Sequence, residues 1–193
     1  MLETLLNLDG GFLLFLQENV RNPMLNTIMI FITSLGDGGF IWIAATIALL
    51  IPKKTRKVGV MSAVALLGSL LINNNIIKNL VQRPRPFVTF TDIQILIPTP
   101  SEFSFPSGHT ASAAMFFPIM FLPLYIEKFN NKKGIALCII FPIVATLIVA
   151  LSRIVVGAHY MSDVLVGGTM TLVSSIFALK ITNLIFKKAQ KNG

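Results

Sequence analysis

The sequence predicts an all-α, polytopic membrane protein, and three observations lead to this fold class. Hydrophobic residues make up 54% of the 193 residues, charged residues only 12%, and the mean hydropathy is +0.77. A soluble domain carries roughly 25% charged residues. The apolar residues also form long runs separated by short Lys- and Arg-rich clusters, which is the pattern of membrane-spanning helices and their loops. We therefore expect a single domain, with a six-transmembrane-helix bundle over residues 23–186.

Residues 1–22 are predicted to form an amphipathic helix that lies in the membrane interface. Apolar residues recur there at helical spacings. These are Leu5, Leu8, Phe12, Phe15 and Leu16, and the polar side consists of Asn7, Asp9, Gln17, Glu18 and Asn19. We expect Gly10-Gly11 to interrupt this helix. The basic start of a signal peptide is missing, so we expect no cleavage.

The first two membrane helices are predicted to form a hairpin. Between Arg21 and Lys53 the only charged residue is Asp37, which lies in the turn-forming sequence Leu-Gly-Asp-Gly-Gly. The hairpin would pair residues 23–34 with residues 39–51. Both helices are short for a hydrocarbon core that takes about 20 residues to cross.

Four further apolar runs complete the predicted bundle, at residues 58–77, 107–126, 134–151 and 164–186. The basic clusters at residues 53–57 and 127–133, and the tail 187–193, should face the cytoplasm. Six crossings then place both termini in the cytoplasm. The prolines between residues 83 and 106 exclude one continuous helix there.

Several basic side chains oppose this charge trend, because the topology places them on the outer side. They are Lys78, Arg83, Arg85 and Arg153, and the two histidines, His109 and His159, fall on the same side. Cations that converge at one face of a membrane protein indicate an anion-binding site. The alternative is ordinary loop chemistry, in which Asp92 and Glu102 balance the charge.

The segment from Ser152 to Asp163 carries the clearest chemical pattern. His159 and Asp163 are four residues apart and share a face if this part is helical. A carboxylate beside a histidine holds one tautomer of the ring and stabilises its positive form, as in an activated base or nucleophile. The planar guanidinium of Arg153 suits a phosphate. The alternative is a polar hinge between two helices, in which His159 and Asp163 merely satisfy each other.

A second pattern is Pro106-Ser107-Gly108-His109, which precedes an apolar run and predicts a helix start with Ser107 as the cap. The free N–H groups of a helix start favour a phosphate, and Gly108 lets the backbone approach it closely. His109 would then lie beside the anion, where it could protonate a leaving oxygen. The alternative is a helix cap with an incidental histidine.

Other classes of function find little support. The positive net charge of +8 comes without a basic face that has interleaved aromatic residues, so we do not expect nucleic-acid binding. The single cysteine, Cys138, lies inside an apolar run, cannot form an internal disulfide and is expected to serve packing.

Three stretches together resemble the type-2 phosphatidic acid phosphatase superfamily, which also contains the vanadium-dependent haloperoxidases. The first is Lys78, six residues, then Arg85-Pro86; the second is Pro106-Ser107-Gly108-His109. The third is Ser152-Arg153, five residues, His159, three residues and Asp163. The resemblance covers the chain from Lys78 to Asp163 by motif. It implies a six-helix bundle with its active site at the extracytoplasmic ends of the core helices.

The resemblance also implies a role for each matching residue. His159 would be the nucleophile that forms a phosphohistidine, Asp163 would orient it, and His109 would be the general acid. The phosphate would be held by Lys78, Arg85 and Arg153, and by Ser107 and Gly108 near the helix start. Arg83 is not in the motif and would screen the substrate or meet lipid headgroups. We expect neither a metal nor another cofactor, because the two histidines and the carboxylate already have roles.

The expected activity is that of a lipid phosphate phosphatase in the bilayer. Undecaprenyl diphosphate is the favoured substrate, phosphatidylglycerol phosphate is second, and phosphatidic acid is a further candidate. Residues 87–104 would shape the access of the headgroup. Two other classes are a non-catalytic carrier of lipid phosphates, which would not need an oriented nucleophile, and a haloperoxidase that binds vanadate, which the small membrane-embedded chain disfavours.

Overall fold

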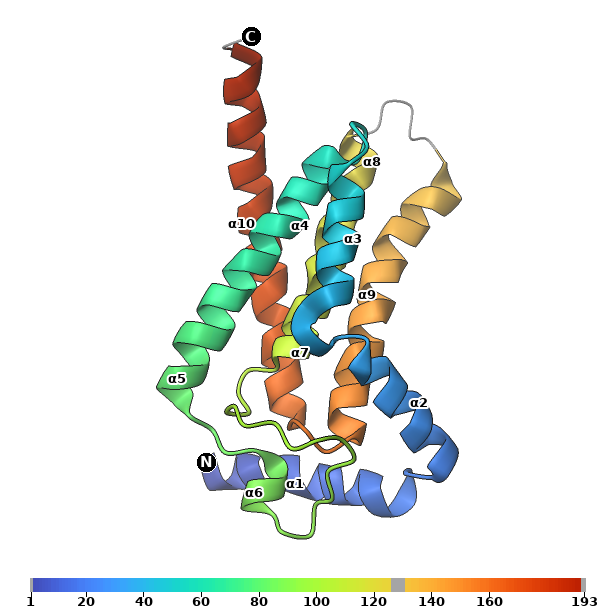
Figure 1. Ribbon diagram of the computed structural model, residues 1–193, viewed down its shortest axis with the longest axis vertical. Coiled ribbons are helices and arrows are strands. Elements are labelled where there is room, and N and C mark those ends of the chain that lie inside the picture. Colours follow the sequence, from blue (N-terminus) through green and yellow to red (C-terminus); the bar gives the residue numbers. More distant parts are fainter. Residues whose placement is uncertain (1, 126–130, 192–193) are drawn as a thin grey trace.

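All regular elements in the computed structural model, which describes residues 2–125 and 131–191, are helices. They form an elongated bundle (Figure 1), and the prediction of an all-α fold is confirmed. The elements are α1 (Leu2–Asn19), α2 (Pro23–Ser34), η1 (Asp37–Gly39), α3 (Phe40–Leu50), α4 (Arg56–Ser69), η2 (Leu70–Ile77), α5 (Lys78–Val81), α6 (Pro86–Thr89), α7 (Gly108–Ala113), η3 (Ala114–Phe121), α8 (Leu122–Tyr125), α9 (Lys132–Val155) and α10 (Met161–Lys191). The long connection between α5 and α7 gathers at one end of the bundle, which we call the loop end (Figure 1).

Helix α1 lies across the loop end (Figure 1). One side buries Leu13 and Leu16 in a cluster with Tyr160 and Val164, whereas Leu5, Leu8 and Phe15 on other sides are exposed. A helix is therefore present at the N-terminus, whereas its amphipathic, interfacial character stays a prediction. The predicted interruption at Gly10-Gly11 is wrong, because the helix continues through both glycines. Gly10 serves close packing instead: a Cβ there would lie 2.4 Å from the ring of Phe90.

Helices α2 and α3 do not form the predicted hairpin. Their axes differ by a bend of 43°, so the chain runs on in the same general direction (Figure 1). Helix α2 begins at Pro23, and the side chain of Asn22 caps it by accepting a hydrogen bond from the N–H of Leu25 at 2.9 Å. The bend arises at η1, where Gly38 and Gly39 take positive φ angles of 63° and 72°.

Helices α4 and α5 are joined through η2, which is a π-helical stretch. The side chain of Asn73 donates a hydrogen bond to the Oγ of Ser69 at 3.0 Å, and Asn74 faces the cavity described below. The predicted crossing at residues 58–77 falls within this path. The path ends at Gln82, which has a left-handed φ of 49°.

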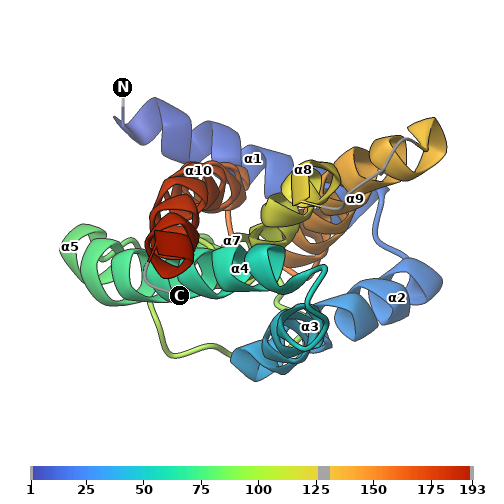
Figure 2. The same ribbon diagram turned by 90° about the horizontal axis from the view of Figure 1, so that it is seen from above.

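The α7–η3–α8 path packs in the middle of the bundle, where it contacts α4, α9 and α10 (Figure 2). Its buried residues Ala113, Met115 and Phe116 form a cluster with Trp42 and Val149. The ring of Trp42 meets the ring of Phe116 edge to face at a centroid distance of 5.5 Å. This packing fixes the start of α7, which carries one of the predicted motifs.

Three helical paths in the described residues are long and apolar enough to cross a membrane, or up to four if the bent pair α2–α3 is one span. A shorter apolar path covers Gly108–Leu124. The count of six crossings is thus not confirmed. Helix α1 and the C-terminal end of α10 lie at opposite ends of the bundle (Figure 1), and the cytoplasmic placement of both termini stays a prediction. The end of the predicted crossing at Ile126, and the predicted loop that includes Lys128, lie outside the described residues.

Candidate active site

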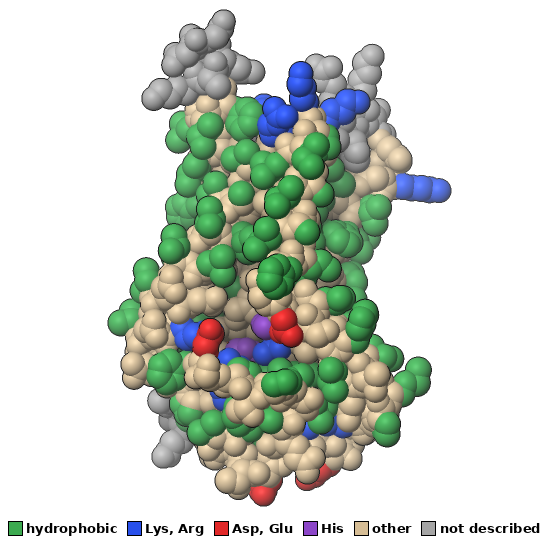
Figure 3. Space-filling model, in the orientation of Figure 1, with side chains coloured by type: hydrophobic (Ala, Val, Ile, Leu, Met, Phe, Trp, Pro, Cys, Tyr) green, Lys and Arg blue, Asp and Glu red, His purple; other side chains and the backbone are tan. Residues whose placement is uncertain are grey.

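A cavity of about 630 Å³ opens between the α2–α3 bend, η2, the start of α7 and the loop that precedes α7. In Figure 3 it is a hollow in the side wall of the bundle, with charged side chains and histidines at its base and hydrophobic side chains above it. Seven ionisable side chains line it: Asp37, Lys78, Arg85, Glu102, His109, Arg153 and His159. The structure therefore brings the three predicted motifs together.

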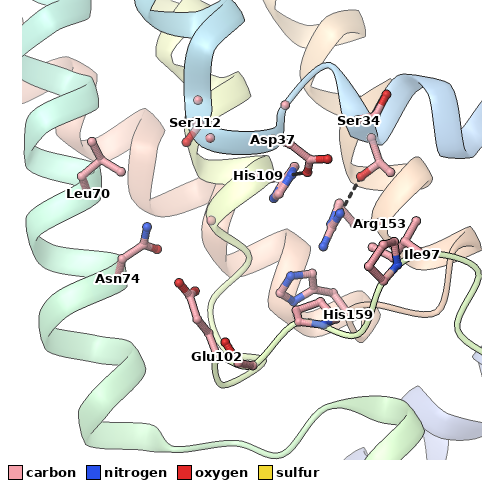
Figure 4. Close-up of a pocket in the computed structure, with 18 of the residues that line it drawn as sticks. Ser34, Asp37, Leu70, Asn74, Ile97, Glu102, His109, Ser112, Arg153 and His159 are labelled. Atoms are coloured by element: carbon pink, nitrogen blue, oxygen red, sulfur yellow. Dashed lines mark hydrogen bonds and ion pairs between the residues drawn. The ribbon is translucent and has the colours of Figure 1, made fainter.

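His159 lies in the tight turn between α9 and α10. The backbone N–H groups of Ala158 and His159 both donate to the carbonyl of Arg153, at 3.1 and 3.3 Å. Gly157 has a φ of +79°, which closes the turn at the end of α9. The turn points the imidazole into the bundle, where 2% of the residue is exposed. Figure 4 shows the ring at the base of the cavity.

Asp163, in the first turn of α10, is fully buried beside this ring. Its Oδ2 lies 3.5 Å from the Nδ1 of His159, which is longer than an ordinary hydrogen bond. Catalytic contacts of this kind often tighten only when substrate binds. Oδ2 also accepts hydrogen bonds from the Oγ of Ser104 at 2.5 Å and the N–H of Tyr160 at 3.0 Å. The carboxylate is thus held by several donors and faces the histidine from a fixed position.

Burial lowers the pKa of His159 to about 3. The nearby Asp163 opposes this effect, while Arg153 and Arg85 add to it. The imidazole is therefore neutral at physiological pH. With Nδ1 facing the carboxylate, the proton belongs on Nδ1, and Nε2 keeps a lone pair on the side where Arg85 lies 3.3 Å away. A neutral ring with an unprotonated Nε2 can act as a nucleophile.

The predicted cations surround the same base of the cavity and are almost fully buried. The guanidinium of Arg85 donates to the carbonyls of Glu102 at 2.7 Å and Ala158 at 2.9 Å. The Nη1 of Arg153 donates to the Oγ1 of Thr33 at 2.5 Å. These hydrogen bonds use some of the N–H groups of each guanidinium and fix its position. The remaining N–H groups are suited to bind an anion.

Lys78 completes the set of cations, and its amine forms an ion pair with the Glu102 carboxylate at 2.5 Å. The Glu102 side chain is 64% exposed, whereas that of Lys78 is 6% exposed. The hydrogen bond from Lys78 lowers the pKa of Glu102, so the carboxylate stays charged. The sequence suggests only that Glu102 is a loop residue that balances nearby positive charge. Nothing in the sequence indicates that its side chain contacts Lys78, which is 24 residues away.

The predicted helix start is confirmed, because α7 begins at Gly108. The Oγ of Ser107 accepts hydrogen bonds from the N–H and the hydroxyl of Thr110, at 3.4 and 3.0 Å. The N–H of Ser107 donates to the carbonyl of Asp163 at 3.1 Å, so the motif docks on α10. Ser107 is fully buried, whereas Gly108 lines the cavity. A Cβ on Gly108 would lie 3.0 Å from Asn74, which shows how closely η2 approaches this backbone.

His109 faces the cavity from the opposite wall to His159 (Figure 4). Its Nε2 lies 2.9 Å from the Oδ1 of Asp37, which is at the α2–α3 bend. Gly36 makes this approach possible, because a Cβ there would lie 2.7 Å from the imidazole. Sequence reasoning assigned Asp37 to a turn alone. The available signal was that Asp37 is a lone charge within a predicted membrane region, and such residues are usually functional.

The arrangement can bind a phosphate and transfer it. It offers a neutral histidine beside a buried carboxylate, a second histidine with its own carboxylate, and three cations around one cavity. Within residues 2–125 and 131–191, no three His, Cys, Asp or Glu side chains are grouped so that they could share a metal ion.

Comparison with known proteins agrees with this geometry. The sequence profile of the PAP2 superfamily matches residues 57–187. Phosphatidylglycerophosphatase B of Bacillus subtilis is 33% identical over 159 residues, covering 80% of this chain and 73% of the relative. Undecaprenyl-diphosphatase BcrC of the same organism is 31% identical over 166 residues, covering 86% and 79%. The crystal structure of a transmembrane PAP2-type phosphatidylglycerolphosphate phosphatase from Bacillus subtilis superimposes with a TM-score of 0.70 at 24% identity, over 97% of this chain and 87% of that one, which supports the fold.

Proposed function

The chain belongs to the PAP2 superfamily and is a lipid phosphatase, and from this premise we propose that it removes the terminal phosphate of undecaprenyl diphosphate through a phosphohistidine at His159. One observation carries the proposal: His159, with the buried Asp163 behind it, lines the same cavity as His109 and the three cations. A carrier of lipid phosphates would need the cations but not a buried histidine whose tautomer is set by a carboxylate.

The first step is attack on phosphorus. The Nε2 lone pair of His159 forms the N–P bond as the P–O bond to the leaving group breaks. His109 donates its proton to the leaving oxygen, and Asp163 stabilises the positive charge that the His159 ring acquires. In the second step His109 accepts a proton from water, the water oxygen attacks phosphorus, and the N–P bond breaks to release phosphate and neutral His159. Asp37 supports the charged form of His109 at 2.9 Å.

Charge at phosphorus is stabilised by the clamp of Lys78, Arg85 and Arg153, together with the backbone N–H groups at the start of α7 near Ser107 and Gly108. The hydrogen bonds of Arg85 and Arg153 fix these two groups before the substrate arrives, so they reorganise little during the reaction. Lys78 has to exchange the Glu102 carboxylate for a phosphate oxygen.

A lipid substrate fits the way in which the cavity opens. Part of its lining is apolar and includes Ile30, Ile43, Leu66, Leu70 and Ile97. Its mouth is in the side wall of the bundle, below a surface of hydrophobic side chains (Figure 3). A lipid could therefore keep its tail in the bilayer while its phosphate reaches the base of the cavity. We favour undecaprenyl diphosphate, because the 31% identical relative is named as an undecaprenyl-diphosphatase. Phosphatidylglycerol phosphate is the second candidate, because the 33% identical relative is named for activity on that lipid.

The cavity is proposed to face the extracytoplasmic side. Basic residues at the other end of the bundle support this orientation through the positive-inside rule. They are Lys53, Lys54, Arg56 and Lys57 around the start of α4, and Lys132 and Lys133 at the start of α9. The C-terminal end of α10 is then cytoplasmic. Helix α1 would lie in the outer interface, with Leu5, Leu8 and Phe15 toward the lipid.

The test is phosphate release by the purified protein in detergent with EDTA present. The substrates are undecaprenyl diphosphate, phosphatidylglycerol phosphate and phosphatidic acid, and His159→Gln is measured beside the wild type. We expect release by the wild type alone, fastest from undecaprenyl diphosphate. A higher kcat/KM for phosphatidylglycerol phosphate would overturn the choice of substrate, and turnover by a folded His159→Gln protein would overturn the nucleophile.

A further inference from the structure

Arg83 connects the first helix of the chain to the catalytic pair. Its Nη1 donates to the Oδ1 of Asp163 at 2.6 Å and to the Oγ of Ser162 at 2.7 Å. Its Nη2 donates to the Oδ2 of Asp9 in α1 at 2.8 Å. The guanidinium also lies over the ring of Tyr160, 3.8 Å from the centroid. Arg83 thus bridges two carboxylates on the side of Asp163 that faces away from the cavity.

Asp163 needs such a partner because a fully buried carboxylate without a cation is costly. His159 does not supply one in the resting enzyme, since its imidazole is neutral. The hydrogen bonds of Arg85 go to two carbonyl groups and toward Nε2 of His159. Arg83 is therefore the cation in direct contact with the buried carboxylate.

Arg83 also fixes the second oxygen of Asp163 through its backbone. Its carbonyl accepts the N–H of Ser104 at 2.8 Å, and the Oγ of Ser104 donates to Oδ2 at 2.5 Å. The side chain and the backbone of one residue thereby hold both carboxylate oxygens. A carboxylate held in this way can rotate little, which keeps Oδ2 directed at Nδ1 of His159.

Asp9 holds Arg83 from the other side. Its two oxygens accept hydrogen bonds from Nη2 of Arg83 and from the hydroxyl and the N–H of Ser162, the residue before Asp163. The side chains of Arg83 and Asp9 are only 14% and 12% exposed. Because the family profile begins at residue 57, Asp9 is a contribution of the N-terminal helix outside the matched segment.

We propose that Arg83 and Asp9 are positioning residues for catalysis, so that helix α1 is part of the machinery that orients the Asp163–His159 pair. This proposal rests on the proposed role of His159 as the nucleophile. The relay runs from Asp9 through Arg83 and Asp163 to His159. It acts on the phosphoryl transfer step and leaves the phosphate clamp on the other side of the ring intact.

The experiment compares kcat and KM for undecaprenyl diphosphate in Arg83→Met, Arg83→Lys, Asp9→Asn and the Arg83→Met/Asp9→Asn double variant. We expect Arg83→Met to lower kcat by about 10- to 100-fold, the range typical of partners that orient a functional histidine. KM should stay within about 3-fold, because a group that acts on the reacting state leaves ground-state binding unchanged. Arg83→Lys should recover part of kcat, and Asp9→Asn should lower it less than Arg83→Met. The double variant should be at most about 2-fold slower than Arg83→Met, because Asp9 acts chiefly through Arg83 and otherwise holds only Ser162 among the described contacts.

Arg21→Met is the matched control. Arg21, just after α1, donates to Gln17 of α1 and to the carbonyl of Gln94 at 2.8 Å, and so ties α1 to the loop before α7. Among the described residues, no hydrogen bond joins Arg21 to Asp163. Its kcat should stay within about 2-fold of wild type. An equal loss in Arg21→Met would show that docking of α1, and not positioning of Asp163, is what matters, and would overturn the proposal. So would independent, multiplicative losses in the double variant.

His159→Gln, measured in parallel, separates this proposal from the proposed function. Turnover in His159→Gln refutes the nucleophile itself. Wild-type kcat in Arg83→Met, with His159→Gln inactive, refutes only the positioning relay. If Arg83→Met does not fold, Arg83→Lys and Asp9→Asn decide the question, and wild-type kcat in both of them overturns the relay.

Discussion

Replacing Gly167 with alanine should displace the start of α7, which we propose binds phosphate. Gly167 lies on α10 against Ser107, and an added Cβ would be 2.7 Å from the carbonyl oxygen of that residue. Ordinary contacts of a Cβ begin near 3.4 Å, so the backbone has to move by about 0.7 Å, the difference between the two distances. That backbone is tied to α10 by the hydrogen bond from Ser107 to Asp163 and continues into Gly108 and His109.

The shift moves Gly108 and His109, which are proposed to bind and protonate the substrate. A misplacement of about 1 Å can cost about 100-fold in rate, so we expect kcat/KM to fall by about 10- to 100-fold. Overpacking of this kind costs about 1–3 kcal/mol of unfolding free energy. The assay is the initial rate of phosphate release from undecaprenyl diphosphate in detergent, with thermal unfolding followed on the same preparations.

The neighbouring Gly168 provides the control, because a Cβ there would meet methyl groups of Thr110 and Thr146 at the ordinary distances of 3.7 and 3.9 Å. Gly168→Ala should keep kcat/KM within about 2-fold and gain up to about 1 kcal/mol from helix propensity. Equal kcat/KM in the Gly167→Ala and Gly168→Ala proteins would refute the reasoning.

Three further predictions concern the ionisable groups of the cavity. Glu102→Gln should release Lys78 and lower the inhibition constant of vanadate, a phosphate mimic, by about 2- to 5-fold, which corresponds to the free energy of a partly exposed ion pair. An unchanged inhibition constant would show that Glu102 does not compete with phosphate for Lys78. Because the folded pKa of His159 is about 3 and the ordinary value is 6.5, the unfolded chain binds a proton in this range that the folded chain does not. Wild type should therefore lose about 1.4 kcal/mol of unfolding free energy per pH unit, relative to His159→Gln, as the pH falls through this window, and parallel denaturation curves would contradict this. Asp37→Asn should lower kcat about 10- to 100-fold by weakening the charged form of His109, more for phosphatidic acid, whose leaving alcohol needs a proton, than for a diphosphate; an equal effect on both substrates would count against the assignment.

The residues of the candidate site could be chosen from the sequence because residue type and short spacing indicate their chemistry, and the structure brings them to one cavity. His159 and Asp163 lie within one turn and the helix that follows it, so four residues of separation were enough to pair them. The convergence of Lys78, Arg85 and Arg153 was inferred from the side of the membrane on which the predicted topology places them. Topology and charge indicated one anion site, and the roles of its residues followed from the family resemblance.

The parts that could not be predicted depend on such contacts or on unrestricted backbone angles. Gly38 and Gly39 allow many directions for the chain, so the sequence alone does not distinguish a hairpin from the bend of 43°. The partners of Asp163 include Arg83, which is 80 residues away in the sequence, and no local sequence pattern indicates that the two side chains meet. Asp37 was visible as an isolated charge, but its partner His109 is 72 residues away.

The most direct test of the central claim is to look for phosphate on His159 during turnover. The His109→Ala protein, in which breakdown of the intermediate is expected to be slow, is mixed with undecaprenyl diphosphate, quenched rapidly and digested for mass spectrometry at neutral to basic pH. We expect a phosphorylated imidazole at His159 that forms within the first turnover and is lost on acid treatment. Steady phosphate release by the wild type, with His159 unmodified in both proteins at every time point, would contradict it.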